Sequence, residues 1–447
     1  MYLVLNLFRD AIILNVRLNY WQFQFFIYYS MVYRFVQGLM WVTFKIFFKR
    51  IDLVGQKKLQ HNHPVILIAN HPGSFLDAMV LAVFLKRLIY FYVRGDIFKH
   101  PLVYRIFTAL HMIPIFNRED GTTNLARNQQ TFDRGRSLLS KGNLLLVFPE
   151  GFSRWSKKLS PFKKGAARVA LQAAFDEPEA IGLSIQAVAV NYSAHRLGAN
   201  LFIRVGDRLD LSNHCQLHRE SPPKAVNKLT IEMFNLFQDN VLHVKQGERT
   251  DVVDEVIRML YNNPKFDRSL FFERVSIACT EISMMTDDEF ENYQSLLNYQ
   301  KRQLSFSRLS DAVIADGRNV KDLVWKAILM SPFFLLGVMI WVVPGSVSKW
   351  IADKTVTRED FYTSVHSGVL GVMGFFWWLI LLSTSLLNGT VLLSLLLFLS
   401  PLFGYIATRW SEEYAYLFAK LRLEKLMKVQ QPLVDELISN RKKLLFF

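Results

Sequence analysis

A histidine and an aspartate lie close together around a short turn in the first quarter of the chain. Residues 70–77 read NHPGSFLD, and they follow an apolar segment, Val65 to Ala69, that is typical of a buried strand. A Pro-Gly turn separates His71 from a helix that would carry Asp77. An imidazole with a pKa near ~6.5 can accept a hydroxyl proton at neutral pH, and a carboxylate can orient the ring. Transfer of an acyl group to a hydroxyl requires such a pair, with His71 as the general base and Asp77 as its partner.

The same residues also have a purely structural interpretation. Ser74 and Asp77 have the spacing of a capping box at the start of a helix, and His71 is then an ordinary turn histidine. A second Asn-His-Pro sequence, at residues 62–64, leads into a strand, and no carboxylate follows it closely. We interpret that second copy as a turn without a catalytic role.

Two further segments place charged residues at the ends of predicted strands. Residues 113–118 read IPIFNR, so that Arg118 follows a strand and can bind a phosphate through its fork of N–H donors. Residues 148–154 read FPEGFSR, and this segment leaves the next strand through a Pro and a Gly. Because free carboxylates do not attract phosphate, Glu150 is better suited to binding an acceptor hydroxyl or orienting a cation. Lys163 and Lys164 precede a helix whose N-terminus favours anions.

In this order and separation, the three segments resemble the motifs of the glycerolipid acyltransferase superfamily. Its members acylate glycerol 3-phosphate or lysophosphatidic acid. The superfamily usually leaves four residues between the His and the Asp, whereas five separate His71 from Asp77. A subgroup that resembles fungal and some bacterial glycerolphosphate acyltransferases has this longer spacing. The resemblance covers roughly residues 51–208.

The resemblance implies a role for each residue of these segments. His71 and Asp77 would be catalytic, and neither a metal nor a cofactor is implied. Many relatives carry an Arg two residues after the Gly of the third segment, where this chain has Ser153 followed by Arg154. A fourth segment, residues 185–192, has Ala187 where a Pro is usual. The implied substrate-binding residues are Asn117, Arg118, Glu150, Gly151, Ser153, Arg154 and Lys163.

The composition indicates a membrane protein. Of the 447 residues, 51% are hydrophobic and 14% are aromatic, and the net charge is +15. Such a charge suits an anionic membrane surface or a nucleic acid. Long apolar stretches between the basic residues and the absence of a nucleic-acid-binding motif favour the membrane. The two cysteines, Cys215 and Cys279, form neither a metal-type cluster nor a disulfide framework.

Alternating strand and helix patterns over residues 51–210 predict an α/β acyltransferase domain, with a mixed, largely parallel sheet flanked by helices. An aromatic, apolar stretch before it predicts N-terminal membrane-embedded helices. A polar helical region and an apolar C-terminal transmembrane helical region follow. The predicted divisions are 1–50 (membrane-associated helices), 51–210 (acyltransferase domain), 211–324 (accessory helices), 325–408 (transmembrane helices) and 409–447 (basic tail).

Two uncharged stretches near the C-terminus have the length of membrane crossings, about 20 residues each. Gly368 to Thr408 is broken near its middle at Asn388 and therefore predicts a hairpin of two helices. Ala327 to Ser348 contains two prolines and is a third crossing or a kinked interfacial helix. Basic residues from Arg409 onward place the tail in the cytoplasm. An even number of crossings then places the catalytic domain on the cytoplasmic side too, where acyl donors are found.

Three functions agree with these features. The first is an integral-membrane enzyme that transfers a fatty acyl group from acyl-CoA or acyl-carrier protein to lysophosphatidic acid or glycerol 3-phosphate. The second is a catalytically silent membrane protein that keeps the fold to bind lipid or a partner. The third is an acyltransferase for another lysolipid. The intact His71 and Asp77 pair favours an enzyme, and Arg118 favours an acceptor that carries a phosphate.

Overall fold

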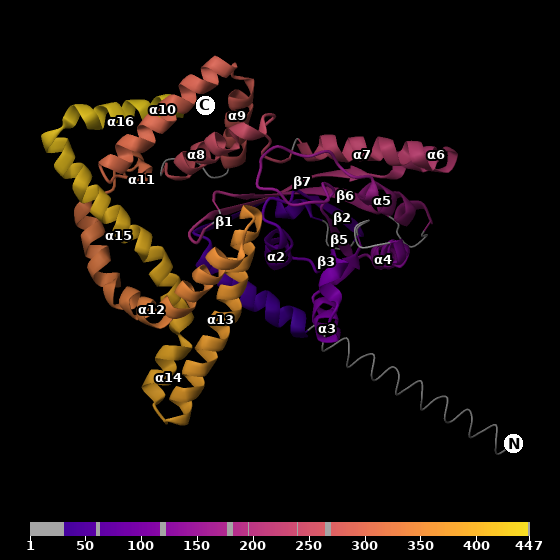
Figure 1. The fold of residues 1–447 in the computed structure, drawn as a ribbon, viewed down its shortest axis with the longest axis horizontal. Helices are drawn as coiled ribbons and strands as arrows, with labels where there is room; N and C mark the ends of the chain where they lie inside the picture. The colour runs from indigo at the N-terminus through magenta and orange to yellow at the C-terminus, as the bar shows by residue number, and fades with distance from the viewer. Residues whose placement is uncertain are drawn as a thin grey trace.

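A seven-stranded sheet forms the centre of the N-terminal half of the protein (Figure 1). The computed structural model describes residues 31–59, 63–116, 122–176, 182–194, 196–238, 240–263 and 270–445. The strand order is β1-β7-β6-β2-β5-β3-β4, and β6 and β7 are the only antiparallel neighbours in this sheet. This confirms the mixed, largely parallel sheet. The strands are β1 (Arg50–Val54), β2 (Val65–Ala69), β3 (Ile89–Arg94), β4 (Met112–Ile115), β5 (Leu144–Val147), β6 (Ser184–Tyr192) and β7 (Asn200–Asp210).

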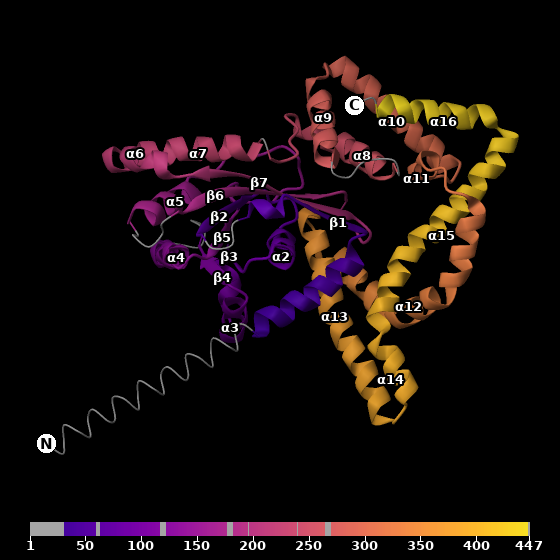
Figure 2. The same cartoon turned by 180° about the vertical axis from the view of Figure 1, so that it is seen from behind.

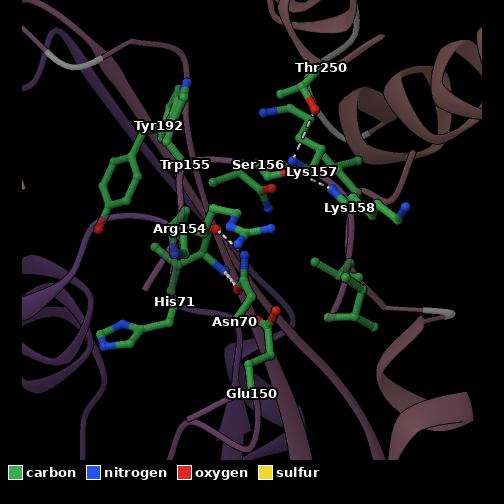
Figure 3. Close-up of a pocket in the computed structure, with 16 residues that line it drawn as sticks. Asn70, His71, Glu150, Arg154, Trp155, Ser156, Lys157, Lys158, Tyr192 and Thr250 are labelled. Atoms are coloured by element: carbon green, nitrogen blue, oxygen red, sulfur yellow. Dashed lines mark hydrogen bonds between the residues drawn. The ribbon is translucent and has the colours of Figure 1, made fainter. Parts of the chain in front are cut away.

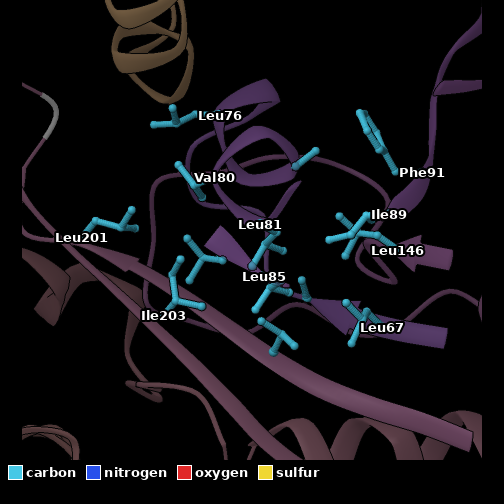
Figure 4. Packing of buried hydrophobic residues seen from close by; sticks show 14 of the residues in the cluster. Leu67, Leu76, Val80, Leu81, Leu85, Ile89, Phe91, Leu146, Leu201 and Ile203 are labelled. Atoms are coloured by element: carbon cyan, nitrogen blue, oxygen red, sulfur yellow. The ribbon is translucent and has the colours of Figure 1, made fainter. Parts of the chain in front are cut away.

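Helices cover both faces of the sheet, which explains why the central strands are continuous apolar runs. All five residues of β2 are buried, and they alternate between two hydrophobic clusters. Val65 and Leu67 face the cluster that contains α2 (Phe75–Phe84), whose packing Figure 4 shows. Ile66 and Ile68 face the other cluster, which contains α5 (Gly165–Asp176) and α7 (Pro222–Gln238). The sheet is therefore the middle layer of the domain.

A helix over residues 31–47 packs on the same face as α2. Met40, Phe44 and Phe47 recur at helical spacing and are buried in the cluster that contains α2, whereas Tyr33 is buried with its ring stacked on His111. The opposite face of this helix exposes further apolar side chains, including Trp41. The first 30 residues of the predicted N-terminal membrane region lie outside the described residues.

Helices also make up the rest of the described chain. Residues 287–306 form a long helix that begins with a capping box between Thr286 and Glu289. It packs against the C-terminal helix, and Gln300 donates a hydrogen bond across this contact to the Leu437 carbonyl oxygen. The other α-helices in the described residues are α3 (Pro101–Ala109), α4 (Thr122–Ser140), α6 (Cys215–Glu220), α8 (Thr250–Tyr261), α9 (Phe271–Met284), α10 (Asp287–Phe306), α11 (Asp311–Ala315), α12 (Val320–Thr355), α13 (Glu359–Leu387), α14 (Val391–Phe398), α15 (Ser400–Val429) and α16 (Gln431–Leu444).

The apolar helices near the C-terminus extend away from the sheet (Figure 1). Among the described residues, α12 and α13 are long and apolar enough to cross a membrane, and α14 with α15 qualifies only as a pair bent by 51°. This confirms a C-terminal region with candidate transmembrane helices. The chain reverses at Asn388 and Gly389, where the φ of Gly389 is 66°, as the predicted hairpin requires. Helix α15 continues through residue 408 as a single element into the basic tail. The number and direction of crossings stay predictions.

Candidate active site

The turn after β2 brings His71 and Asp77 into direct contact. Asn70 anchors the end of the strand, because its side-chain amide exchanges two hydrogen bonds of 2.8 Å with the backbone of Val190 on β6. The chain then turns into α2, whose first turn carries Asp77. The Nδ1 atom of His71 lies 2.8 Å from Oδ2 of Asp77. The predicted pairing of these two residues is therefore present in the structure.

Asp77 is completely buried and receives several hydrogen bonds. Besides His71, the backbone N–H of Gly73 donates to Oδ2 at 2.9 Å, and the Tyr192 hydroxyl donates to Oδ1 at 2.7 Å. Burial raises the pKa of the Asp77 carboxyl, and the hydrogen bonds from His71, Tyr192 and Gly73 counteract part of this shift. The close approach requires a glycine, since a Cβ on Gly73 would lie 2.8 Å from Oδ1 of Asp77.

The capping-box interpretation of this turn does not hold. Ser74 occupies the N-cap position of α2, but its side chain makes no capping hydrogen bond. Its φ of 53° is unusual for a residue with a side chain. The Asp77 carboxylate is directed to His71, Gly73 and Tyr192 instead of to the backbone of Ser74. The aspartate thus serves the histidine and not the helix end.

The His71 ring is held in a defined orientation with one nitrogen left for chemistry. It stacks on Phe148, with ring centroids 3.9 Å apart and an angle of 11° between the planes. Because Nδ1 faces the Asp77 carboxylate, the tautomer that donates from Nδ1 leaves Nε2 to accept a proton. The side chain of His71 is 19% exposed, so that a substrate can reach it. This geometry suits a general base.

The Phe-Pro-Glu-Gly segment forms a tight turn after β5. Gly151 has a φ of 75°, and a Cβ on it would lie 2.6 Å from Nζ of Lys163, so that the lysine crosses directly over the glycine. Glu150 is buried and accepts a hydrogen bond of 2.9 Å from the backbone N–H of Ser160. Burial raises the pKa of the Glu150 carboxyl, and the hydrogen bonds from Ser160 oppose this. Glycine is therefore a conformational requirement here, and Lys163 is exposed beside it.

The lining of a small pocket beside the turn includes Arg154, Lys157 and Lys158 (Figure 3). The exposed side chain of Arg154 lines this pocket, and its backbone N–H donates to the His71 carbonyl oxygen at 3.1 Å. Figure 3 shows the His71 ring directed away from Arg154 and Glu150, on the side to which the Tyr192 hydroxyl also points. Lys157 is buried and pairs with Asp254 of α8, with 2.5 Å between Nζ and Oδ1. Arg154 is thus accessible to a ligand, whereas the Lys157 charge is already compensated.

The candidate membrane helix α13 reaches into the site through its first turns. Ser364 donates a hydrogen bond of 2.7 Å to the Gly73 carbonyl oxygen and accepts one of 3.1 Å from the Leu76 N–H. The Ser153 hydroxyl bonds to the carboxylate of Asp360, which in turn pairs with Arg358. The Ser153 side chain is therefore engaged by α13. Its role as a substrate ligand stays a prediction.

The structure brings most of the predicted site residues to one region, and it adds others. His71, Glu150 and Arg154 line the same pocket, and the His71 ring points away from the other two side chains. Asn117 and Arg118 lie outside the described residues, so that their roles stay predictions. The residues that sequence reasoning missed are Tyr192, Phe148, Ser364 and Asp360. Tyr192 stood in the fourth segment without an assigned role, whereas no sequence signal points to Ser364 or Asp360, because they lie in an apolar helix far along the chain.

Part of the chain is similar in sequence to known acyltransferases. Residues 50–191 match the family model described as Acyltransferase. A 1-acyl-sn-glycerol-3-phosphate acyltransferase of Chlamydomonas reinhardtii is 32% identical over 148 residues, which are 33% of this chain and 42% of that protein. A chloroplastic 1-acyl-sn-glycerol-3-phosphate acyltransferase of Brassica napus is 29% identical over 133 residues, which are 29% of this chain and 37% of that protein. The chain thus spans less than half the length of these curated relatives.

A solved structure is also similar in part. The crystal structure of the 1-acyl-sn-glycerophosphate (LPA) acyltransferase PlsC from Thermotoga maritima aligns with a TM-score of 0.33 at 17% sequence identity. The alignment covers 46% of this chain and 79% of that chain.

Proposed function

Because residues 50–191 belong to the glycerolipid acyltransferase superfamily, we propose that this protein is a membrane-bound acyltransferase that acylates lysophosphatidic acid. The acyl donor is a fatty acyl thioester, carried by CoA or by acyl-carrier protein. The observation that carries the proposal is the His71 and Asp77 pair, with a buried carboxylate 2.8 Å from the imidazole. The names of the relatives and the candidate membrane helices support an acceptor that itself resides in the bilayer.

In the proposed reaction, Nε2 of His71 removes the proton from the acceptor hydroxyl as its oxygen attacks the thioester carbonyl. The resulting tetrahedral oxyanion collapses and expels the thiolate, which takes the proton from the imidazolium. Asp77 stabilises the imidazolium and keeps the ring in the tautomer that leaves Nε2 free. No covalent enzyme intermediate is needed, because the acceptor attacks the donor directly.

Basic residues near the pocket would bind the acceptor phosphate. Arg154 is exposed and lines the pocket, and Lys163 lies over Gly151. Arg118, which the family motif pairs with a phosphate, completes the proposed set. We expect that Arg118→Ala raises the KM of the acceptor far more than the KM of the acyl donor. Equal changes in both constants would mean that Arg118 shapes the site without holding the phosphate.

The decisive experiment is an acyl-transfer assay on the purified full-length chain. Lysophosphatidic acid, glycerol 3-phosphate and a neutral lysolipid are each tested with acyl-CoA and with acyl-carrier protein. Transfer to lysophosphatidic acid supports the proposal. Faster transfer to another acceptor would show that lysophosphatidic acid is not the preferred substrate. Binding of lysophosphatidic acid without transfer to any acceptor would favour the catalytically silent alternative.

A pair of histidine variants tests whether His71 is the general base in this assay. His71→Ala should reduce turnover by about 10²–10⁴, the usual contribution of a positioned base. His63, in the second Asn-His-Pro sequence, is exposed, and His63→Ala should retain turnover. More than about a tenth of wild-type turnover in His71→Ala would refute the assignment of the base.

A further inference from the structure

The N-terminus of α2 lacks a cap from its own sequence, although it carries the candidate catalytic aspartate. The first amides of a helix have no partner within the helix, and the N-cap side chain usually accepts from one of them. Ser74 is at that position, but its φ of 53° is not the extended conformation of an N-cap, and it makes no capping hydrogen bond. Asp77, at the third helical position, is directed toward His71. Neither Ser74 nor Asp77 therefore supplies a side-chain acceptor to the first amides of α2, whose local acceptors are the backbone carbonyls of Gly73 and Ser74.

Ser364 supplies that acceptor from α13. Its Oγ accepts from the N–H of Leu76, the second residue of α2, at 3.1 Å. The same hydroxyl donates to the carbonyl oxygen of Gly73 at 2.7 Å. The Leu76 N–H also donates to the Gly73 carbonyl oxygen at 3.2 Å, so that the Leu76 amide, the Gly73 carbonyl and the Ser364 hydroxyl are all hydrogen-bonded to one another. Ser364 is buried, and its hydroxyl uses its single donor and one acceptor lone pair in these two hydrogen bonds.

A second set of contacts ties the start of α13 to the segment after Gly151. Arg358 donates to the backbone oxygen of Ser153 at 3.0 Å, and the Ser153 hydroxyl bonds to Asp360. Asp360 is buried and lies 2.8 Å from the Arg358 guanidinium. Figures 1 and 2 show, from opposite sides, that the first turns of α13 lie beside α2. One helix thus contacts both loops that carry the candidate site.

We propose that the first two turns of α13 are part of the active site, and that Ser364 is a positioning residue for the His71 and Asp77 pair. Ser364 acts as an N-cap from another helix: it holds the Gly73 carbonyl and the Leu76 amide so that Asp77 stays aligned with Nδ1 of His71. The apolar C-terminal helices are then required for turnover and not only for membrane attachment. This inference rests on the proposed acyl transfer for its kinetic test. Residues 358–364 lie outside the segment that matches the family model.

Substitutions at Ser364 separate the hydroxyl from the packing of the helix. Thr and Val have the same shape, but only Thr keeps a hydroxyl, so that Ser364→Thr and Ser364→Val form a matched pair. Ser364→Ala removes the hydroxyl without adding bulk. Ser367 is the control, because it is buried on the same helix and its hydroxyl bonds only to the Ser364 carbonyl oxygen among the described residues.

We expect Ser364→Ala and Ser364→Val to lower kcat about tenfold, in line with a lost N-cap hydrogen bond, while the KM values of both substrates stay unchanged. Ser364→Thr should restore most of the activity, and Ser367→Ala should behave as the wild type. Hydrogen exchange of the amides in residues 73–78, followed by mass spectrometry, should be faster only in the Ala and Val variants. This exchange measurement requires no catalysis.

Four results would overturn the inference. The first is wild-type kcat in Ser364→Ala, and the second is equal activity in the Val and Thr variants. The third is a loss in Ser367→Ala as large as that in Ser364→Ala, since general packing would then explain both. The fourth is failure of the Ala and Val variants to fold, which would show that the hydroxyl serves stability. If the wild type transfers no acyl group, the proposed function fails, and the exchange rates alone decide the role of Ser364.

Discussion

The buried hydroxyl of Tyr192 offers a test of how Asp77 supports the base. Tyr192→Phe removes only the oxygen that donates to Oδ1 of Asp77 at 2.7 Å. The ring can keep its stacking on Phe48, where the centroids are 5.9 Å apart. Asp77 then retains two donors, His71 and the Gly73 N–H. The substitution therefore weakens the support of the carboxylate without opening a large cavity.

The size of the effect follows from the hydrogen bond that is lost. A hydrogen bond to a charged group contributes about 1.5–3 kcal/mol, and a change of about 1.4 kcal/mol in the activation free energy changes the rate tenfold. Burial already raises the pKa of the Asp77 carboxyl, and the Tyr192 hydroxyl lowers it. Without that hydroxyl, the pKa of Asp77 rises further, because the carboxylate loses one of the donors that oppose its desolvation. The ionised carboxylate is the active form, so that activity is lost as the pH falls through this pKa. The acid limb of the pH profile should move to higher pH.

The assay is the pH dependence of kcat/KM for acyl transfer, with Tyr92→Phe as the control. The hydroxyl of Tyr92 is also buried in the sheet, and it has no hydrogen-bond partner among the described residues. We expect Tyr192→Phe to lower the plateau of kcat/KM by about tenfold and to move the acid limb to higher pH. Tyr92→Phe should change neither. A Tyr192→Phe profile that superimposes on the control would refute the argument that this hydroxyl tunes Asp77.

Three further predictions follow from close contacts and from the hairpin. Gly73→Ala should reduce turnover by more than about 10², because the added methyl would lie 2.8 Å from the Asp77 carboxylate; near-normal kinetics would contradict this packing. Lys157→Met should lower the free energy of unfolding by about 3–5 kcal/mol, since it leaves Asp254 buried without its partner, and Asp254→Leu in the same chain should recover much of the loss in denaturant unfolding. A single cysteine at Asn388, in a background without the native cysteines, should react with an impermeant thiol reagent on intact cells, whereas one in the C-terminal tail should not; labelling of both would refute the hairpin topology.

Local sequence was sufficient for the parts of the site that one turn can hold together. Five residues separate His71 from Asp77 across a Pro-Gly turn, and the chain has no room to place them far apart. The apolar run of β2 was likewise predicted with its observed bounds, because strands covered on both faces need continuous hydrophobic residues. The hairpin break at Asn388 was also predicted, since an uncharged run of twice the bilayer length must reverse near its middle.

Other elements depended on contacts between distant segments. Strand β1 was not predicted, because Arg50 and Asp52 alternate with apolar residues in only five positions, and its partner β7 lies about 150 residues later in the chain.

The capping of α2 is the clearest case of an element that depends on a distant segment. Ser74 has the sequence pattern of an N-cap, yet the positive φ that places Asp77 beside His71 turns its side chain away from that role. The compensating hydroxyl of Ser364 comes from a helix 288 residues beyond Leu76.

The amino-acid sequence by itself determined the chemistry of the site: a histidine with a carboxylate partner at the end of a buried strand, within a chain that also carries apolar helices. The tertiary structure alone decided which distant groups complete it, namely Tyr192 from β6 and Ser364 from α13. The physical reason is that local sequence fixes which groups are hydrogen-bonded only where both partners lie in the same turn or helix. A buried donor or acceptor at the end of an element is satisfied by whichever segment the packing brings there.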